Sequence, residues 1–329
     1  MTGPTTHRVI HGDARDLSLL ADESIHLVCT SPPYAFLKKY NPDVEGQLGD
    51  ILDYEAFLDE LDKVWRECAR VLVPGGRIAC VVGDVCISRR RGGRHYVLPL
   101  SADIQVRSRR IGLDNLTPIR WYKVANIKLE ASKSSVFLGK PNQPNGVVKN
   151  DVEHVLLLRK PGGYRTPTEE MMQLSRISTD DYRRWFTPIW EGVTGQLRRG
   201  HPAPYPIEVP TRLIRMFSFA GDTVLDPFGG TGTTAVAAIE TGRSSVLYDI
   251  DPDYIAMAKA RLDTMKVPVH YEKASQREHV DEDRLAAARE QLAGALSHAR
   301  TSDDLMKAIE DVQRALSDSP GSPRRITAG

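Results

Sequence analysis

The chain has 329 residues, of which 41% are hydrophobic and 26% charged, and this composition is typical of a globular protein with one large domain or two. The formal net charge of +1 means that any affinity for nucleic acid must come from local clusters of charge. The apolar runs are too short to span a bilayer, and the N-terminus lacks the apolar segment of a secretory signal. We therefore expect a cytoplasmic protein with no membrane partner.

The cysteine pattern argues against both disulfides and zinc. Cys29, Cys68, Cys80 and Cys86 form no C-x-x-C pair and show no zinc-ligand spacing. We expect all four to be reduced, buried thiols, and we expect no metal site.

The first half of the chain predicts alternating strands and helices. Expected strands cover residues 8–12, 25–29, 77–82, 116–122 and 152–158, and expected helices cover residues 54–71 and 98–111. The first of these helices is the clearest, because its apolar residues recur at helical spacing. Residues 123–150 show no period, and residues 161–200 are also expected to be irregular, apart from an aromatic patch at 185–190.

After residue 210 the alternation becomes regular. Helices are expected over 211–219, 234–241 and 252–265, and strands over 223–225 and 244–248. Alternation of this kind predicts an α/β fold built on a parallel sheet. From residue 272 the chain has no aromatic residue but keeps helical periods, so we expect a helical tail. The tail could pack on the body or on a second copy, or it could be a plain surface extension.

A glycine-rich loop follows the expected strand at 223–225. Gly230, Gly232 and Ala235 fit the dinucleotide pattern G-x-G-x-x-A, and Asp249 follows about twenty residues later, where it could bind ribose hydroxyls. However, Asp226 before the glycines would repel a pyrophosphate and could pair with an ammonium group. Phe228 could offer its ring face to a sulfonium or an adenine. These features favour S-adenosyl-L-methionine over a dinucleotide as the cofactor.

The second informative loop is Ser31-Pro32-Pro33-Tyr34, directly after the strand at 25–29. Two prolines remove two backbone donors, so the loop presents carbonyl oxygens beside the Ser31 hydroxyl. Acceptors of this kind suit an exocyclic NH₂ group of a base and stabilise the positive charge that develops when its nitrogen attacks a methyl group. Tyr34 could stack on the ring. The sequence therefore indicates methyl transfer to a base that has left the duplex.

Between residues 87 and 140 there are twelve lysines and arginines against three acidic residues. This asymmetry is typical of a surface that contacts phosphates, although a charge run can also be a solvated loop. The basic residues expected to contact DNA are Arg89, Arg90, Arg91, Arg94, Lys123, Lys128 and Lys133. Arg107, Arg109 and Arg110 lie in the same run.

With the Ser31–Tyr34 loop before the glycine loop, the chain resembles the permuted, β-class amino-methyltransferases of bacterial DNA over residues 7–265. The resemblance implies a Rossmann-like, seven-stranded mixed sheet with helices on both faces. It places Ser31, Pro32, Pro33 and Tyr34 at the target amine. It assigns the cofactor to Asp13, Thr30, Pro202, Tyr205, Asp226, Phe228, Gly229, Gly230, Thr231, Gly232, Thr233 and Asp249.

The resemblance also divides the chain into four parts. Residues 1–122 would form the catalytic half of the methyltransferase domain, 123–200 the target-recognition region, 201–271 the cofactor-binding half and 272–329 the tail. Expected partners are double-stranded DNA, a second copy of the chain and a cognate restriction endonuclease.

Serine before the two prolines resembles the enzymes that methylate N4 of cytosine, whereas aspartate is commoner in those that methylate N6 of adenine. Because both residues can accept hydrogen bonds from either amine, adenine stays an alternative. Two other interpretations are an NAD-dependent oxidoreductase built on the same glycines and a DNA-binding protein without activity. The first leaves the Ser31–Tyr34 loop unexplained, and the complete set of motif residues argues against the second.

Overall fold

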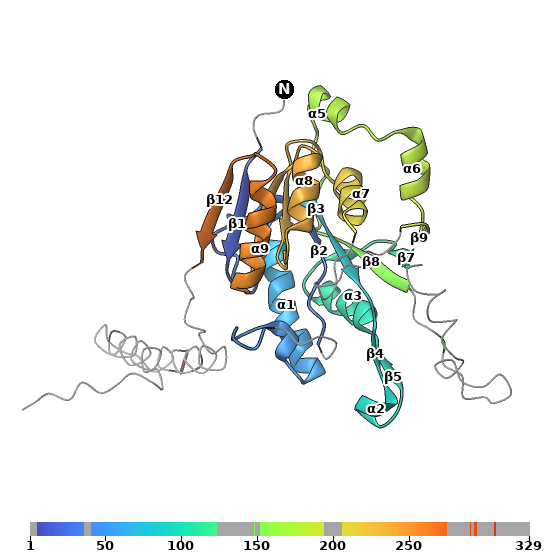
Figure 1. Cartoon of the computed structure of the whole chain (residues 1–329), viewed down its shortest axis with the longest axis vertical. Helices are drawn as coiled ribbons and strands as arrows, with labels where there is room; N and C mark the ends of the chain where they lie inside the picture. Colours follow the sequence, from blue (N-terminus) through green and yellow to red (C-terminus); the bar gives the residue numbers. More distant parts are fainter. Residues whose placement is uncertain are drawn as a thin grey trace, which may run out of the picture. The chain divides into compact units, whose positions relative to one another are not determined.

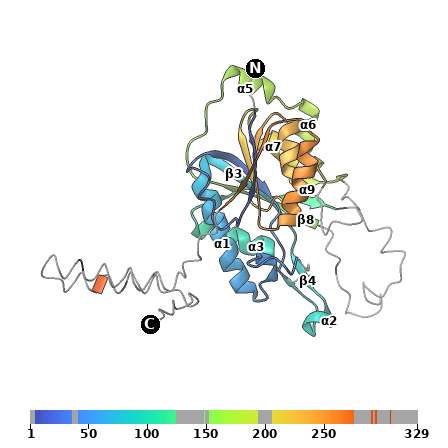
Figure 2. The ribbon, with the colours of Figure 1, turned by 60° about the vertical axis from the view of Figure 1, so that its left-hand side comes forward.

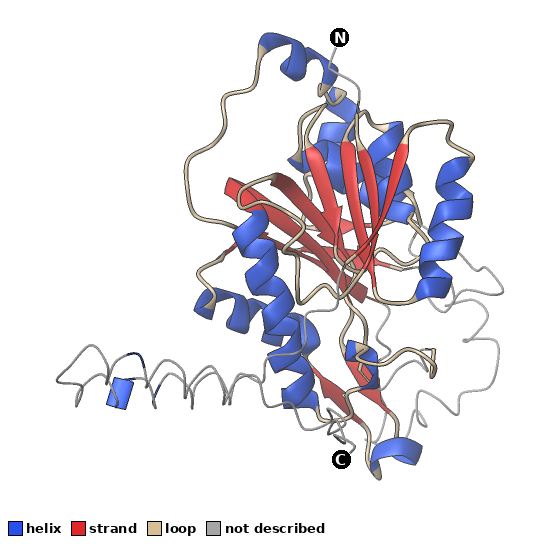
Figure 3. Ribbon diagram, turned by 90° about the vertical axis from the view of Figure 1, so that its left-hand side faces the viewer, coloured by secondary structure: helices blue, strands red, loops and turns tan. Residues whose placement is uncertain are grey.

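The computed structural model describes residues 5–35, 41–123, 148, 152–193, 206–274, 290, 293–294 and 306. The described part of the chain is an α/β fold with one large sheet and helices on both of its faces, as expected (Figures 1 and 3). None of the described helices has the length and apolar character needed to cross a membrane.

The strands of the large sheet are β1 (His7–His11), β2 (Ile25–Thr30), β3 (Leu72–Val82), β6 (Asp114–Asn115), β7 (Ile119–Tyr122), β8 (Val152–Arg159), β9 (Ile189–Trp190), β10 (Thr223–Asp226), β11 (Ser244–Asp249) and β12 (Val269–Lys273). Their order is β12-β1-β11-β10-β2-β3-β8-β7-β9, and β6 also pairs with β8. The pairs from β12 to β3 are parallel, and β8 is antiparallel to β3, β6 and β7. The described sheet thus has ten strands rather than seven, because β12 and β9 extend its ends and the two-residue β6 lies beside β8.

Strand order explains how the two loops of the sequence come together. β2 and β10 are neighbours, with Val224 opposite Leu27 and Leu225 opposite Val28. Because the two strands are parallel, their carboxyl ends lie at the same edge of the sheet, and ligands of open α/β sheets bind at such edges. Loops far apart in the sequence therefore meet.

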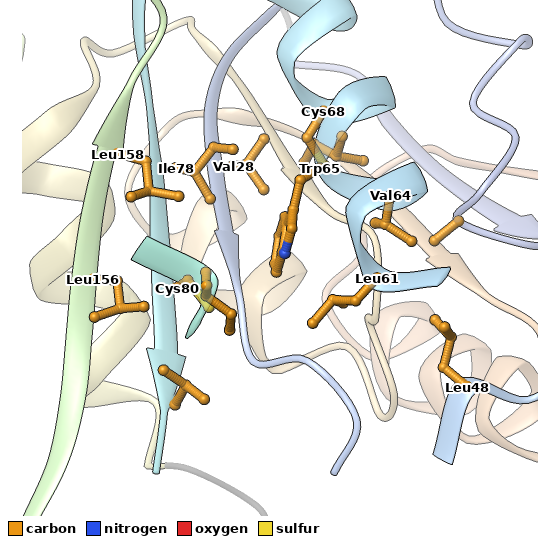
Figure 4. Packing of buried hydrophobic residues seen from close by; sticks show 14 of the residues in the cluster. Val28, Leu48, Leu61, Val64, Trp65, Cys68, Ile78, Cys80, Leu156 and Leu158 are labelled. Atoms are coloured by element: carbon orange, nitrogen blue, oxygen red, sulfur yellow. The ribbon is translucent and has the colours of Figure 1, made fainter. Parts of the chain in front are cut away.

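Helices α1 (Tyr54–Val71) and α3 (Leu100–Arg110) pack on one face of the sheet, and α7 (Glu208–Phe217), α8 (Thr233–Glu240) and α9 (Pro252–Asp263) on the other. Asp53 begins α1 by accepting a hydrogen bond from the Ala56 amide at 2.8 Å. Trp65 of α1 is completely buried against β2 and β3 (Figure 4). Burial of this aromatic side chain fixes α1 above the strands that carry the site.

Two excursions from the sheet have no counterpart in the sequence-based prediction. β4 (Val85–Ile87), α2 (Arg89–Gly92) and β5 (Tyr96–Leu98) form an arm that extends from β3 (Figure 1). The range 161–193, expected to be irregular, contains α5 (Glu169–Leu174), α6 (Thr179–Trp185) and β9 (Figure 2). Side chains of Thr168 and Ser178 accept hydrogen bonds from the first turns of α5 and α6. Helices this short are held by such caps and show no apolar period.

Three further expectations need correction. Cys86 is exposed, because alternate residues of the two-stranded arm face solvent, whereas the other three cysteines are buried as expected. β8 lies inside the range assigned to target recognition, yet it is a central strand of the sheet. The strand expected from residue 116 begins at Ile119. The four-part division of the chain stays a prediction. By contacts the chain splits into units 1–274 and 275–329, and nearly all of the second lies outside the described residues.

Candidate active site

A cavity of about 380 Å³ opens at the carboxyl edge of the parallel strands. The segments that line it follow β1, β2, β3, β10 and β11, and its far wall includes the start of β8. The lining residues are Asp13, Ala14, Ser31–Tyr34, Gly46–Gly49, Gly83, Asp84, Lys123, Val152, Glu153, Asp226–Thr231, Thr233, Asp249–Asp251 and Tyr254. Both loops singled out in the sequence thus face one cavity.

The glycine loop turns sharply between β10 and α8. Gly230 and Gly232 have φ angles of 50° and 78°, a region that glycine enters without steric cost. Gly229 is needed for a different reason, because a Cβ atom there would lie 2.0 Å from Cγ of Leu247 on β11. The loop therefore passes too close to the sheet to carry a side chain at this position.

Asp226, at the end of β10, differs from expectation. Its carboxylate accepts hydrogen bonds from the Thr30 hydroxyl at 2.7 Å, the Thr234 hydroxyl at 2.6 Å and the Phe228 amide at 3.1 Å. The residue is only 3% exposed. Three internal donors thus occupy most of the carboxylate's acceptor sites, so its main observed role is to join the end of β2 to the cofactor loop and to α8.

Asp249, at the end of β11, accepts hydrogen bonds from the Gly230 amide at 2.8 Å and the Asp251 amide at 2.9 Å. Its carboxylate also lines the cavity. Two of about four acceptor sites are used by these amides, so acceptor sites remain on this carboxylate. Binding of ribose hydroxyls by Asp249 stays a prediction.

Burial raises the pKa of Asp226 to about 6, although hydrogen bonds from Thr234, Thr30 and Phe228 act in the opposite direction. Burial likewise raises the pKa of Asp249 to about 6, against its two backbone hydrogen bonds. Both carboxylates are therefore costly to ionise in the folded protein, and a cationic ligand in the cavity would favour their charged forms.

The carboxylate of Asp13, after β1, is held by Arg15, whose Nη2 lies 2.5 Å from it. Arg15 also pairs with Glu60 of α1 at 2.6 Å and donates to the Gly46 carbonyl at 2.8 Å. Arg15 thereby fixes the segment at 46–49 against β1 and α1. Sequence reasoning missed this role of Arg15 and the segment at 46–49, because Arg15 meets Glu60 and Gly46 only through long-range contacts.

In the Ser31–Tyr34 loop, the Tyr34 hydroxyl accepts a hydrogen bond from the Gly83 amide at 3.0 Å. Burial and the nearby Glu153 carboxylate raise the pKa of Tyr34, while hydrogen bonds with Gly83 and Ser31 lower it less, so the phenol stays protonated at neutral pH. The hydroxyl is thus anchored to the end of β3, while the residue lines the cavity. Stacking on a base stays a prediction.

Lys123 and Glu153 form an ion pair of 2.7 Å in the wall of the same cavity. Lys123 was expected to contact DNA phosphates, but its charge is matched by Glu153, and its ammonium lies 5.3 Å from the centre of the Trp121 ring. Asp84 lines the cavity as well. No sequence pattern marks Glu153, because its position depends on β8 running antiparallel to β3.

The basic run divides into two groups. Arg89, Arg90, Arg91 and Arg94 are all exposed on the β4–α2–β5 arm, which leaves β3 at the cavity residues Gly83 and Asp84 (Figure 3). Arg107 instead forms ion pairs with three carboxylates of α1, at Glu55, Asp59 and Asp62. Its inclusion in the phosphate-contacting run was wrong, because it joins α3 to α1.

Several predicted residues lie outside the described part of the chain. These are Pro202 and Tyr205 of the expected cofactor segment, and Lys128 and Lys133 of the expected DNA surface.

Comparison with known proteins identifies the family to which this chain belongs. Residues 25–260 match the DNA methylase family whose members modify N6 or N4 amino groups. The chain belongs to this N6/N4 DNA methylase family. Membership confirms the predicted cofactor, S-adenosyl-L-methionine, and the predicted reaction class, methyl transfer to DNA. It excludes the oxidoreductase interpretation.

Two relatives illustrate the extent of the match. The type II methyltransferase M.MjaI of Methanocaldococcus jannaschii is 39% identical over 277 residues, which are 75% of this chain and 88% of that protein. A candidate DNA modification methylase from Thermus thermophilus, solved in complex with S-adenosyl-L-methionine, is 45% identical with a TM-score of 0.67. The alignment covers 83% of this chain and 100% of that one.

The close approach of Gly229 to Leu247 gives a steric test of the methylase's cofactor loop. Gly229→Ala should lower the melting temperature and weaken S-adenosyl-L-methionine binding at least about tenfold, because the loop must move away from β11. Calorimetric titration and thermal unfolding measure the two effects.

Gly163→Ala is the matched control, because a Cβ at Gly163 meets no atom within 4 Å. Shortening the opposing side chain in the double variant Gly229→Ala/Leu247→Ala should restore part of the lost cofactor affinity. Wild-type affinity in Gly229→Ala, or no recovery in the double variant, would contradict the steric explanation.

The raised pKa of Asp226 gives a test by pH. A folded pKa of about 6 against an ordinary 3.8 means that this group's favourable contribution is complete below pH 3.8 and is lost as the pH rises through about 6. The free energy of unfolding of the wild type, relative to Asp226→Asn, should therefore fall by about 3 kcal/mol between about pH 4 and pH 7.

Urea unfolding at a series of pH values measures this difference without cofactor present. Asp180→Asn, at an exposed position of α6, is the control for the change of charge. If the free energy of unfolding of the wild type, relative to Asp226→Asn, is constant or rises with pH, the three hydrogen bonds outweigh burial at Asp226.

Proposed function

We propose that this methylase transfers a methyl group to the exocyclic N4 of cytosine in double-stranded DNA. The observation that carries the proposal is that the Ser31–Tyr34 loop and the Asp226–Thr233 loop line one cavity and are joined by the Thr30–Asp226 hydrogen bond of 2.7 Å. An amine acceptor and a cofactor loop held together in this way are what direct methyl transfer requires.

The cavity suits the cofactor in size and charge. Its volume of about 380 Å³ falls in the range of small-molecule sites, about 300–1,000 Å³. Carboxylates of Asp13, Asp226 and Asp249 lie along it, and Phe228 contributes an aromatic ring. We assign the ribose to Asp249, the adenine end to Asp13 and the methionine end to the loop after Asp226. When bound, S-adenosyl-L-methionine supplies a methyl group from a positive sulfonium, whose sulfur retains the electrons of the broken bond.

The Ser31–Tyr34 loop acts on the amine. Ser31 Oγ and the carbonyls of the two-proline segment accept the N4 hydrogens, which localises the nitrogen lone pair and stabilises the charge that develops as it forms the new N–C bond. The surplus N4 proton leaves by way of Ser31 Oγ to water. Tyr34, anchored through its hydroxyl to Gly83, presents its ring to the base.

The base must leave the duplex to reach the cavity, at a cost of roughly a few kcal/mol. Phosphate contacts offset this cost, and the exposed arginines of the β4–α2–β5 arm are placed to make them, because the arm starts from the cavity wall at Gly83 and Asp84. The name of the M.MjaI relative supports a type II restriction–modification setting. A second copy and a cognate endonuclease stay predictions.

The target base is identified by the product. When duplex DNA is incubated with tritium-labelled S-adenosyl-L-methionine and digested to nucleosides, the label should appear in N4-methyl-2′-deoxycytidine. Label in N6-methyladenine would show that the target base is adenine rather than cytosine and would leave the rest of the proposal standing. Label on carbon-5 of cytosine, or no label in DNA, would overturn the proposal.

Two Tyr34 variants separate its roles in the same assay. Tyr34→Phe keeps the ring and removes the hydrogen bonds with Gly83 and Ser31, and it should lose less activity than Tyr34→Ala. Tyr34→Ala should reduce methyl transfer about 100-fold or more with cofactor affinity largely kept. Loss of cofactor affinity in Tyr34→Ala would contradict its assignment to the base.

The arm is tested by the triple variant Arg89→Gln/Arg90→Gln/Arg91→Gln. It should raise the KM for DNA. It should also make the negative slope of log K against log salt less steep by about 3, because each phosphate contact contributes roughly 0.9 to its magnitude. Cofactor affinity should not change. The matched control replaces three exposed basic residues outside both the arm and the expected target-recognition range, Arg66, Lys259 and Lys266, by glutamine. An equal effect of both triples on the slope would remove the arm from the DNA interface.

A further inference from the structure

A second cavity, of about 410 Å³, lies at the opposite edge of the sheet, where β2 and β3 begin and α7 ends. It is lined by His26, Val73–Arg77, Tyr164, Arg165, Ser175, Ile177, Tyr182 and Arg215–Phe219. None of these residues lines the methyl-transfer cavity. The second cavity is therefore separate from the site described above.

The cavity carries an excess of positive charge. Arg77, Arg165 and Arg215 line it, and no acidic residue does among those described. Arg165 is balanced by the buried carboxylate of Asp222, to which both of its Nη atoms donate. Arg77 and Arg215 form no salt bridge with any described carboxylate. Arg77 thus lacks a counter-ion within the described protein, and the carboxylate that acts on Arg215, Asp181, is shared with Arg184.

Arg77 is the less well satisfied of the two. Its Nε atom is buried and has no hydrogen-bond partner among the described residues, although its guanidinium has a hydrogen bond with the Tyr164 side chain. Burial lowers the pKa of this guanidinium. Arg215 donates to the Arg176 carbonyl at 3.2 Å. A half-buried guanidinium without a carboxylate is destabilising, so a bound anion is the simplest compensation.

The walls around these charges are aromatic. The Arg77 guanidinium lies 5.0 Å from the centre of the Phe217 ring, and Phe219, Tyr164 and Tyr182 also line the cavity. Guanidinium groups bind phosphate through paired N–H donors, and aromatic faces bind planar rings. The volume exceeds what an isolated phosphate needs and falls in the range of small-molecule sites.

We propose that this second cavity binds a nucleoside monophosphate or a similar phosphate monoester with a planar ring. Arg77 and Arg215 hold the phosphate, and the aromatic side chains hold the ring. The ligand sits across the sheet from the methyl-transfer cavity, so its binding does not require an empty cofactor site.

Uridine monophosphate is the probe, because uracil has neither the exocyclic amine expected at the Ser31–Tyr34 loop nor the adenine expected at the cofactor loop. Equilibrium dialysis of the full chain, saturated with S-adenosyl-L-methionine, should show saturable binding. Uridine and inorganic phosphate should each bind at least about tenfold more weakly. Phosphate binding as tight as the nucleotide would overturn the role of the aromatic wall.

Arg77→Gln should weaken binding of the nucleotide at least about tenfold, since it removes a charge-assisted pair of hydrogen bonds. Arg66→Gln, at an exposed position of α1 outside the cavity, should bind it like the wild type. A melting temperature is recorded for each variant, and Arg215→Gln replaces Arg77→Gln if the latter does not fold. No saturable binding to the wild type, or equal affinity in the arginine variants, would overturn the proposal. Because no step measures methyl transfer, the result is independent of the target base.

Discussion

The buried carboxylate of Asp226 accepts hydrogen bonds from three places, the end of β2 at Thr30, the cofactor loop at Phe228 and helix α8 at Thr234, and the rest of the site depends on this junction. Hydrogen bonds to a charged group contribute about 1.5–3 kcal/mol each. Burial nevertheless outweighs them, since the pKa of the group is raised to about 6. The protein therefore maintains an ionised carboxylate at a cost, and in return the segment after β2 and the glycine loop after β10 keep a fixed relation.

The same sheet gives the two cavities opposite electrostatic character. The carboxyl edge gathers Asp13, Asp84, Asp226 and Asp249 around a cavity for a cofactor that carries a sulfonium and an ammonium. The amino edge gathers arginines around a cavity that no described acidic residue lines. Parallel strands make this separation simple, because residues that follow the strands and residues that precede them come to opposite edges. A cavity lined by carboxylates and a cavity lined by arginines are thereby kept apart.

The parts of this structure that could be predicted are those with a local signal. Helix α1 was predicted over residues 54–71, its observed bounds, because its apolar stripe is long and regular. The Ser31–Tyr34 and Asp226–Thr233 segments were found because prolines and glycines mark backbone that must turn. α2, α5 and α6 have seven residues or fewer and show no period, so they were missed.

Long-range partners could not be predicted either. Asp226 was expected to point at a ligand, since nothing in the sequence indicates that Thr30 and Thr234 converge on it. Glu153 reaches the cavity only through strand order, and Arg15 meets Glu60 only because α1 packs beside the segment after β1. In the sequence, Arg107 cannot be distinguished from the other arginines of the basic run. In the structure, three carboxylates of α1 lie beside it. For charged side chains, the residue type indicates the chemistry, and the fold decides the partner.

The base of the arm shows how the fold connects the exposed arginines to the cavity. It begins at Asp84, and the carboxylate of Asp84 accepts a hydrogen bond at 2.9 Å from the amide of Ser101, near the start of α3 where the chain returns. Leu100, beside Ser101, is completely buried, so the base of the arm is fixed in the core. Gly83, one residue before Asp84, donates to the Tyr34 hydroxyl. The exposed arginines of the arm are thus linked to the Ser31–Tyr34 loop through a short, hydrogen-bonded stretch of backbone. Under the proposed function, this connection lets binding energy from phosphates position the base.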